Sequence, residues 1–275
     1  MEYGNASEEN NGVLIVIEAL KIDKIPRYRR VRVWFLLLFA IAAATYLTMP
    51  NNTNMIVYRE QLQQFLLTRE IFPVPPLEFF ETLIREAFLI ALSMYFLLLY
   101  AVTWIDSQTL EKSGIAIDDA ATQSSADDSR KKRHSASSVA RRHYPKFLLL
   151  AIASLTPYLF SLPLMNIPYY IYVSMFSMTI MIIVYEEKKI PEAMEASYIM
   201  TKGMKFFIFI SFMFLRSVLS IISNVLQMIF AGGVWSSSLI NAYFFALRTL
   251  AFGRLIAMLY RAFTTGDLKN NAQHF

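Results

Sequence analysis

The sequence contains no cysteine, and its 275 residues include only three histidines, His134, His143 and His274. The absence of cysteine excludes disulfide bonds, thiolate metal sites and cysteine nucleophiles. No metal-ligand constellation, phosphate-binding loop or HExxH pattern occurs in the sequence. We therefore expect no metal and no cofactor. We also expect a non-enzymatic protein, because nothing in the sequence would activate its many serine and tyrosine hydroxyls.

Charged residues are also scarce. They make up 17% of the chain, against about 25% in soluble domains. Hydrophobic residues reach 56%, and they are gathered into runs that approach the roughly 20 residues needed to cross a bilayer. We therefore expect an all-α, polytopic membrane helix bundle with six transmembrane helices. The expected spans are Val33–Met49, Ala87–Ile105, Phe147–Met165, Ile167–Tyr185, Phe206–Phe230 and Val234–Tyr260.

Lysine and arginine are unevenly divided between the two sides that six spans would create. Twenty of the 26 basic residues fall on the side of the two chain ends, and three fall on the opposite side. The positive-inside rule then predicts that both termini are cytoplasmic. The predicted layout is a cytoplasmic tail at 1–32, a transmembrane pair at 33–105 with an outer helical loop at 50–86, a disordered cytoplasmic basic loop at 106–146, a four-helix transmembrane region at 147–260 with a cytoplasmic helix at 191–205, and a cytoplasmic tail at 261–275.

Two apolar segments outside the spans are too short to cross a membrane. Gly12–Ile22 either lies flat on the inner leaflet or docks on the bundle as a short helix. Met55–Leu67 has helical periodicity, which predicts a small helical cap over the outer face.

The long connection at Ser107–Tyr144 is polar, and we expect it to be disordered. Its basic run is either a contact for anionic lipid of the inner leaflet or an ordinary positive-inside loop. We expect no nucleic-acid partner, because these charges must sit at a membrane surface. The run consists of Arg130, Lys131, Lys132 and Arg133.

Three arginines fall inside the expected spans, whereas no Asp or Glu does. A charge at mid-span costs at least about 2.5–3.5 kcal/mol, so these arginines are functional candidates. Helix rise places Arg216 roughly 15 Å and Arg248 roughly 18 Å from the cytoplasmic helix ends. Arg254 is only about 9 Å deep, so we expect it to snorkel to the inner-leaflet headgroups.

Polar side chains recur at helical spacing beside two of these arginines. Two such stripes on neighbouring helices would form either a cavity for an anion or lipid headgroup, or a closed hydrogen-bonded helix interface. The cavity candidates are Arg216, Ser220, Asn224, Gln227, Asn241 and Arg248, with Ser223 and Ser237 on the same faces.

The segment from Glu186 to Gly203 carries the pattern Ala193, Ser197-Tyr198 and Thr201-Lys202-Gly203 after the fourth expected span. This pattern resembles that of the YciC-like six-helix bacterial membrane proteins, in the superfamily of the membrane domain of glycerophosphodiester phosphodiesterases. The resemblance implies a multi-pass protein of a bacterial plasma membrane. It does not imply phosphodiesterase activity, because no such catalytic domain is present. Met204, where the family usually has a polar or basic residue, departs from the pattern.

Two functions remain open from the sequence. One is a scaffold or an envelope-protection factor of the immunity type. The other is a transporter or lipid-handling subunit that uses the arginine-lined cavity. The expected partners are the lipid bilayer, including anionic lipid, and another membrane protein or a transporter ATPase.

Overall fold

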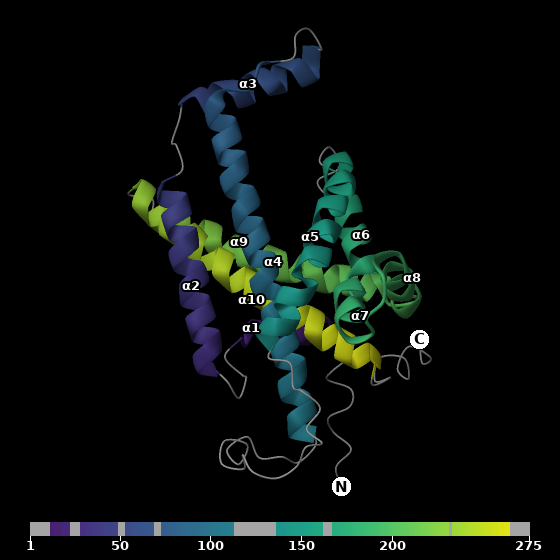
Figure 1. The fold of residues 1–275 in the computed structure, drawn as a ribbon. Coiled ribbons are helices and arrows are strands. Elements are labelled where there is room, and N and C mark those ends of the chain that lie inside the picture. The colour runs from purple at the N-terminus through teal and green to yellow at the C-terminus, as the bar shows by residue number, and fades with distance from the viewer. Residues whose placement is uncertain are drawn as a thin grey trace.

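The computed structural model describes residues 12–22, 28–48, 53–68, 73–112, 136–161, 167–230 and 233–264. All regular structure in these residues is helical (Figure 1). The helices are α1 (Gly12–Leu20), α2 (Tyr28–Leu47), α3 (Thr53–Thr68), α4 (Leu77–Lys112), α5 (Ala136–Ser161), α6 (Ile167–Phe176), α7 (Thr179–Tyr185), α8 (Ile190–Met200), α9 (Lys205–Ile229) and α10 (Val234–Thr264).

Five stretches of the described chain are long and apolar enough to cross a membrane, and they make this a multi-pass membrane protein. They are Arg29–Leu47, Leu77–Gln108, Ile167–Tyr185, Lys205–Ile229 and Trp235–Thr264. Each overlaps one of the six expected spans. The remaining expected span, Phe147–Met165, falls on α5 and runs past its described end at Ser161. The sixth span therefore stays a prediction.

Large apolar side chains cover the outer faces of these helices. Val33 and Leu36 on α2 are each 60% exposed, and Met228 on α9 is 78% exposed. Apolar surface on this scale is uncommon on a soluble monomer. It is expected where lipid tails are the solvent.

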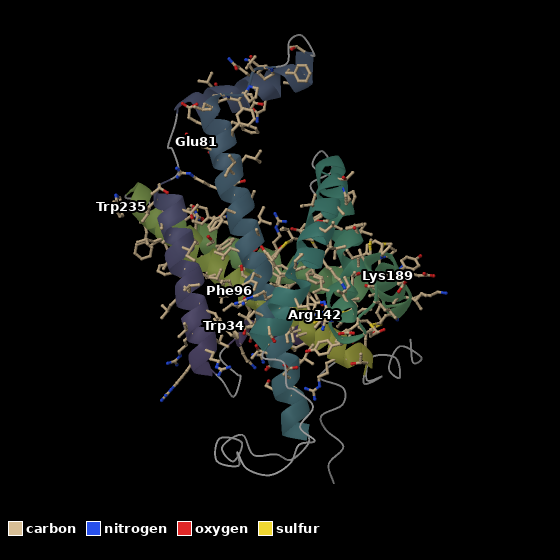
Figure 2. The ribbon with its side chains drawn as sticks, in the orientation of Figure 1. Trp34, Glu81, Phe96, Arg142, Lys189 and Trp235 are labelled. Atoms are coloured by element: carbon tan, nitrogen blue, oxygen red, sulfur yellow. The ribbon has the colours of Figure 1, made fainter. Side chains whose placement is uncertain are left out.

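Two tryptophans lie near opposite ends of the helix bundle, as interfacial aromatic residues do. They are Trp34 on α2 and Trp235 on α10 (Figure 2).

The helix α10 forms the centre of the bundle and packs against α1, α2, α4 and α9. It crosses α4 obliquely (Figure 1). The crossing is close because Gly253 has no side chain. A Cβ atom at this position would lie 2.8 Å from the carbonyl oxygen of Leu97 in α4. The backbones of α4 and α10 therefore touch at this level.

The apolar segment at the N-terminus docks on the bundle, which is the second of the two alternatives that the sequence left open. The helix α1 packs against α9 and α10, and Val16 and Ala19 are buried there. The driving force is burial of one apolar face, because a nine-residue helix is marginal in isolation.

The predicted outer helix is present as α3, which lies across the end of α4 (Figure 1). The ring of Tyr58 packs against that of Phe79, with 5.3 Å between centroids. The helix α4 itself has 36 residues, a length of about 54 Å. It therefore extends well beyond the expected span Ala87–Ile105.

The connection between the second and third expected spans is more ordered than the sequence indicated. The helix α4 continues to Lys112 and α5 begins at Ala136, so the expectation of disorder does not hold for residues 107–112 and 136–144. Burial explains the difference, because Ser107, Ala140 and His143 are enclosed by neighbouring helices. The segment 113–135, with the basic run at 130–133, lies outside the described residues.

The fourth expected span is divided into α6 and α7 by a turn at Ser177 and Met178. The helix α8 packs against both halves. It ends at Met200, whereas the predicted helix extended to residue 205, because the chain turns through Thr201–Met204. Gly203 has φ +88° in this turn, a backbone conformation that glycine adopts at little cost.

Candidate functional site

Arg216 on α9 and Arg248 on α10 lie at the same level of an antiparallel helix pair. Two contacts fix the register of this pair. The rings of Phe212 and Phe252 stack with 5.6 Å between centroids, and Gln227 donates a hydrogen bond of 2.9 Å from Nε2 to Asn241 Oδ1. Arg216 follows Phe212 by one helical turn, and Arg248 precedes Phe252 by one turn. The two guanidinium groups are close enough to act on each other electrostatically.

Two tyrosines from other helices lie next to this arginine pair. The guanidinium carbon of Arg216 lies 5.0 Å from the ring centroid of Tyr170 on α6, which is a cation–π distance. Tyr46 on α2 is within electrostatic reach of Arg248, and its ring packs edge-on against that of Phe245. Residues of α2, α6, α9 and α10 therefore lie around the pair, while Arg216 stays exposed on one side.

The arginine pair has no countercharge in the described part of the chain. Neither guanidinium makes a hydrogen bond or ion pair to a described residue, and Nε of Arg248 is buried without a partner. Leaving a buried polar donor unsatisfied costs about 1–3 kcal/mol, and more for a charged group. Two like charges at one level raise this cost further. An anion at this position would relieve both penalties.

The rest of the predicted stripe forms a closed helix interface. Besides its bond to Asn241, Gln227 donates to Ser223 Oγ at 3.2 Å and accepts from Ser237 Oγ at 3.5 Å. The bonds to Asn241 and Ser237 join α9 to α10 beyond the arginines, and the bond to Ser223 lies within α9. Asn224 instead lies on the exposed side of α9, and Ser220 is half-buried. The stripe thus separates into a satisfied amide cluster and an unsatisfied arginine pair.

Arg254 does not extend to the lipid headgroups, although its position near the helix end predicted this. Its residue is only 3% exposed, and Nη2 pairs with Oε1 of Glu18 on α1 at 2.8 Å. The reason is that α1 docks across α10 and brings a carboxylate to this level. Glu18 is the sole acid in the apolar segment Gly12–Ile22. An isolated acid in such a segment was the signal from which this pair could have been inferred.

Two of the residues that carry the family resemblance, Ser197 and Thr201, hold the turn between α6 and α7. Ser197 Oγ donates to the carbonyl oxygen of Met175 at 3.1 Å and accepts from the backbone N–H of Met178 at 3.2 Å. Thr201 Oγ1 also lies 3.3 Å from the Met175 carbonyl oxygen. Both side chains are fully buried. The helix α8 thereby satisfies backbone groups that the interrupted span leaves open.

We expect Ser197→Ala to lower the free energy of unfolding by about 1–2 kcal/mol, because it leaves the buried N–H of Met178 without its partner and removes one of the two hydroxyls that bond the Met175 carbonyl oxygen. Thermal unfolding of the detergent-solubilised protein measures this change. Ser154→Ala is the matched control, since Ser154 Oγ bonds a carbonyl oxygen of its own helix. Equal stability of the two variants would contradict a clamp at this turn.

His143 is a buried histidine outside the expected spans. It lines a small cavity with Leu98, Phe147 and Ile183, and its Nδ1 atom has no described partner. Burial lowers its pKa, and the nearby charges of Lys146 and Arg142 lower it further. The opposing charge of Glu187 does not reverse this lowering of the pKa, so His143 favours the neutral form more than a free histidine does. The described residues contain no group of His, Asp and Glu that could hold a metal ion.

These helices and contacts define the class of the chain as a multi-pass membrane protein. Comparison with protein-family models, with curated proteins and with solved structures finds no match to the chain.

Proposed function

We propose that the chain is a non-enzymatic membrane protein that binds an anionic, phosphate-type group between α6, α9 and α10, as a transport or lipid-handling protein does. The observation that supports this function is the arginine pair itself. Arg216 and Arg248 lie together without a countercharge from the described residues, and Nε of Arg248 is buried and unpaired.

A phosphate-type oxyanion fits this arrangement best among small anions. A guanidinium presents several N–H donors in a rigid fork that matches phosphate oxygens. Two such forks at one level supply more donors than a halide needs.

The proposed topology has six spans with both ends in the cytoplasm of a bacterial cell. The uneven distribution of lysine and arginine supports this orientation. The resemblance to YciC-like proteins is part of the same proposal. It is supported by the structural roles of three residues of the shared pattern. Ser197 and Thr201 bond the Met175 carbonyl oxygen at the turn between α6 and α7, and Gly203 adopts a positive φ in the turn between α8 and α9.

Binding of short-chain phosphatidylglycerol to the purified protein in an uncharged detergent tests the proposed site. We expect the lipid to raise the unfolding temperature, because a ligand that binds only the folded state stabilises it. The double variant Arg216→Gln/Arg248→Gln should lose affinity by at least about tenfold, since it removes charge-assisted hydrogen bonds worth roughly 1.5–3 kcal/mol each.

Arg29→Gln/Arg30→Gln is the matched control, because both residues are exposed at the start of α2. It removes the same charge without touching the site. Affinity that falls equally in both double variants would reflect net charge alone and would contradict the proposal. Arg216→Lys tests the donor geometry separately from the charge, since lysine keeps the positive charge and loses the forked N–H donors of the guanidinium.

A scaffold or envelope-protection function is the second candidate, and the amide cluster of Gln227, Asn241, Ser223 and Ser237 favours it. Gln227 bonds Asn241 and Ser237 across α9 and α10 and Ser223 within α9, as polar groups do at a rigid helix interface. In that case the protein acts by binding another membrane protein. If the Arg216→Gln/Arg248→Gln variant still performs the protein's cellular function in full, this result would favour the second function over the first.

A further inference from the structure

We infer that the group bound by the arginine pair is the phosphate of a membrane phospholipid, which enters sideways from the bilayer. We further infer that the protein in this way speeds the movement of phospholipids between the two leaflets. The inference rests on the proposed anion site and specifies both its ligand and its activity.

The first step is the exposure of Arg216. Its side chain is exposed even though α6 and α10 both pack against α9. The exposed apolar residues Phe214, Ile221 and Val225 lie on another side of α9, where they contact lipid tails in a membrane. Arg216 lies at the edge of the exposed surface, near Ser217 and Ser220, at mid-length of a helix long and apolar enough to cross the membrane. Arg216 is therefore open to the bilayer, and a lipid can reach it without passing through the protein.

The second step is the depth of the pair. Arg216 is the twelfth of the 25 residues of α9, so roughly 16 Å of helix precede it and roughly 20 Å follow it. The side chain is too short to bring its charge to either headgroup layer from the middle of such a helix. A phosphate that pairs with Arg216 must therefore leave its own headgroup layer and enter the hydrocarbon region.

The third step is the polar path beside Arg216 on the same helix. Ser217, Ser220 and Asn224 follow one another at helical spacing toward the outer end of α9, and Ser217 and Asn224 are exposed. Their hydroxyl and amide groups can bond a headgroup. A phospholipid that leaves the arginine pair in this direction meets a polar group at each helical turn.

These features lower the main barrier to lipid crossing. A phosphate in hydrocarbon loses its hydration, and this loss makes unassisted crossing slow. A guanidinium pair at mid-depth replaces water as the donor and neutralises the charge. The lipid itself serves as countercharge for Arg216 and Arg248 during the crossing. No covalent bond is made or broken.

The test uses phosphatidylcholine vesicles that contain a small fraction of phosphatidylglycerol with a fluorescent label on its headgroup. A membrane-impermeant reductant bleaches only the label in the outer leaflet, so further bleaching reports lipid crossing. We expect the reconstituted protein to speed crossing by at least about tenfold over protein-free vesicles, as a charge-paired path should. Arg216→Gln/Arg248→Gln should slow this crossing by about fivefold or more.

Asn224→Leu keeps both arginines and interrupts only the polar path, so it should slow crossing while binding of short-chain phosphatidylglycerol is retained. Asn224→Leu also keeps the inference testable if the double arginine variant fails to fold. In vesicles that contain the control variant Arg29→Gln/Arg30→Gln, the lipid should cross at the rate seen with the unaltered protein.

The outcomes separate the two proposals. If the protein binds short-chain phosphatidylglycerol but crossing stays at the protein-free rate, the lipid-crossing inference is overturned and the anion site stands. If inorganic phosphate stabilises the protein and the lipid does not, the ligand is a soluble anion and the inference also fails. If neither probe binds and no crossing occurs, both proposals are overturned.

Discussion

Replacing Glu18 with glutamine is expected to destabilise the protein by about 3 kcal/mol, because the variant leaves the charge of Arg254 buried without a partner. The Arg254 side chain is 4% exposed and the Glu18 side chain 36%. The partial exposure of Glu18 allows some screening, so the expected loss lies at the lower end of the range of about 3–5 kcal/mol for broken buried pairs. Thermal unfolding in detergent measures the loss of stability.

The two partners of this pair should respond differently. Arg254→Gln leaves a carboxylate that still reaches solvent and pairs with Lys21 at 2.8 Å, so it should cost less than Glu18→Gln. Glu195→Gln is the matched control, because Glu195 is exposed on α8. Hydrogen exchange should show faster opening of α1 in Glu18→Gln, since the pair helps to hold this short helix on α10. A loss no greater than that of the control would show that the pair does not stabilise the docked helix.

Replacing Gly253 with valine is expected to cost about 3 kcal/mol or more and to loosen the contact between α4 and α10. Even an added Cβ would lie 2.8 Å from the carbonyl oxygen of Leu97. The obstructing atom is backbone, which cannot rotate away as a flexible side chain can. The helices must therefore separate along the most buried part of the bundle. Unfolding temperature and the yield of monodisperse protein measure the effect.

The matched control is Gly233→Val, because nothing lies within 4 Å of a Cβ atom built at Gly233. It adds the same side chain in open space at the start of α10. A graded series through Gly253→Ala should show destabilisation that increases with side-chain size. Equal stability of the valine variants at 253 and 233 would contradict close contact of the two backbones.

The clamp at the α6–α7 turn and the arginine pair are linked through α6. Ser197 and Thr201 bond the carbonyl oxygen of Met175 near the end of α6, and the same helix presents Tyr170 to Arg216. The position of α8 therefore helps to determine where the Tyr170 ring lies. This link gives the buried hydroxyls of α8 a structural role at some distance from the proposed ligand.

The membrane-spanning character of this protein follows from sequence alone. Apolar runs near 20 residues identify a lipid environment whatever their neighbours are, because the hydrophobic effect acts on each run separately. Five of the six expected spans correspond to helices long and apolar enough to cross a membrane. The mid-span positions of Arg216 and Arg248, and the absence of acids from the expected spans, likewise need nothing beyond the sequence.

The contacts of the buried charges were decided only by the tertiary structure. Glu18 and Arg254 are separated by 236 positions in sequence, and no local pattern links two residues so far apart. The division of the polar stripe into a bonded amide cluster and an unpaired arginine pair depends on the register of α9 against α10. The break between α6 and α7 is stabilised by side chains from α8. Helix formation depends on neighbours within a few residues, whereas the satisfaction of a buried charge depends on which distant helix packs against it.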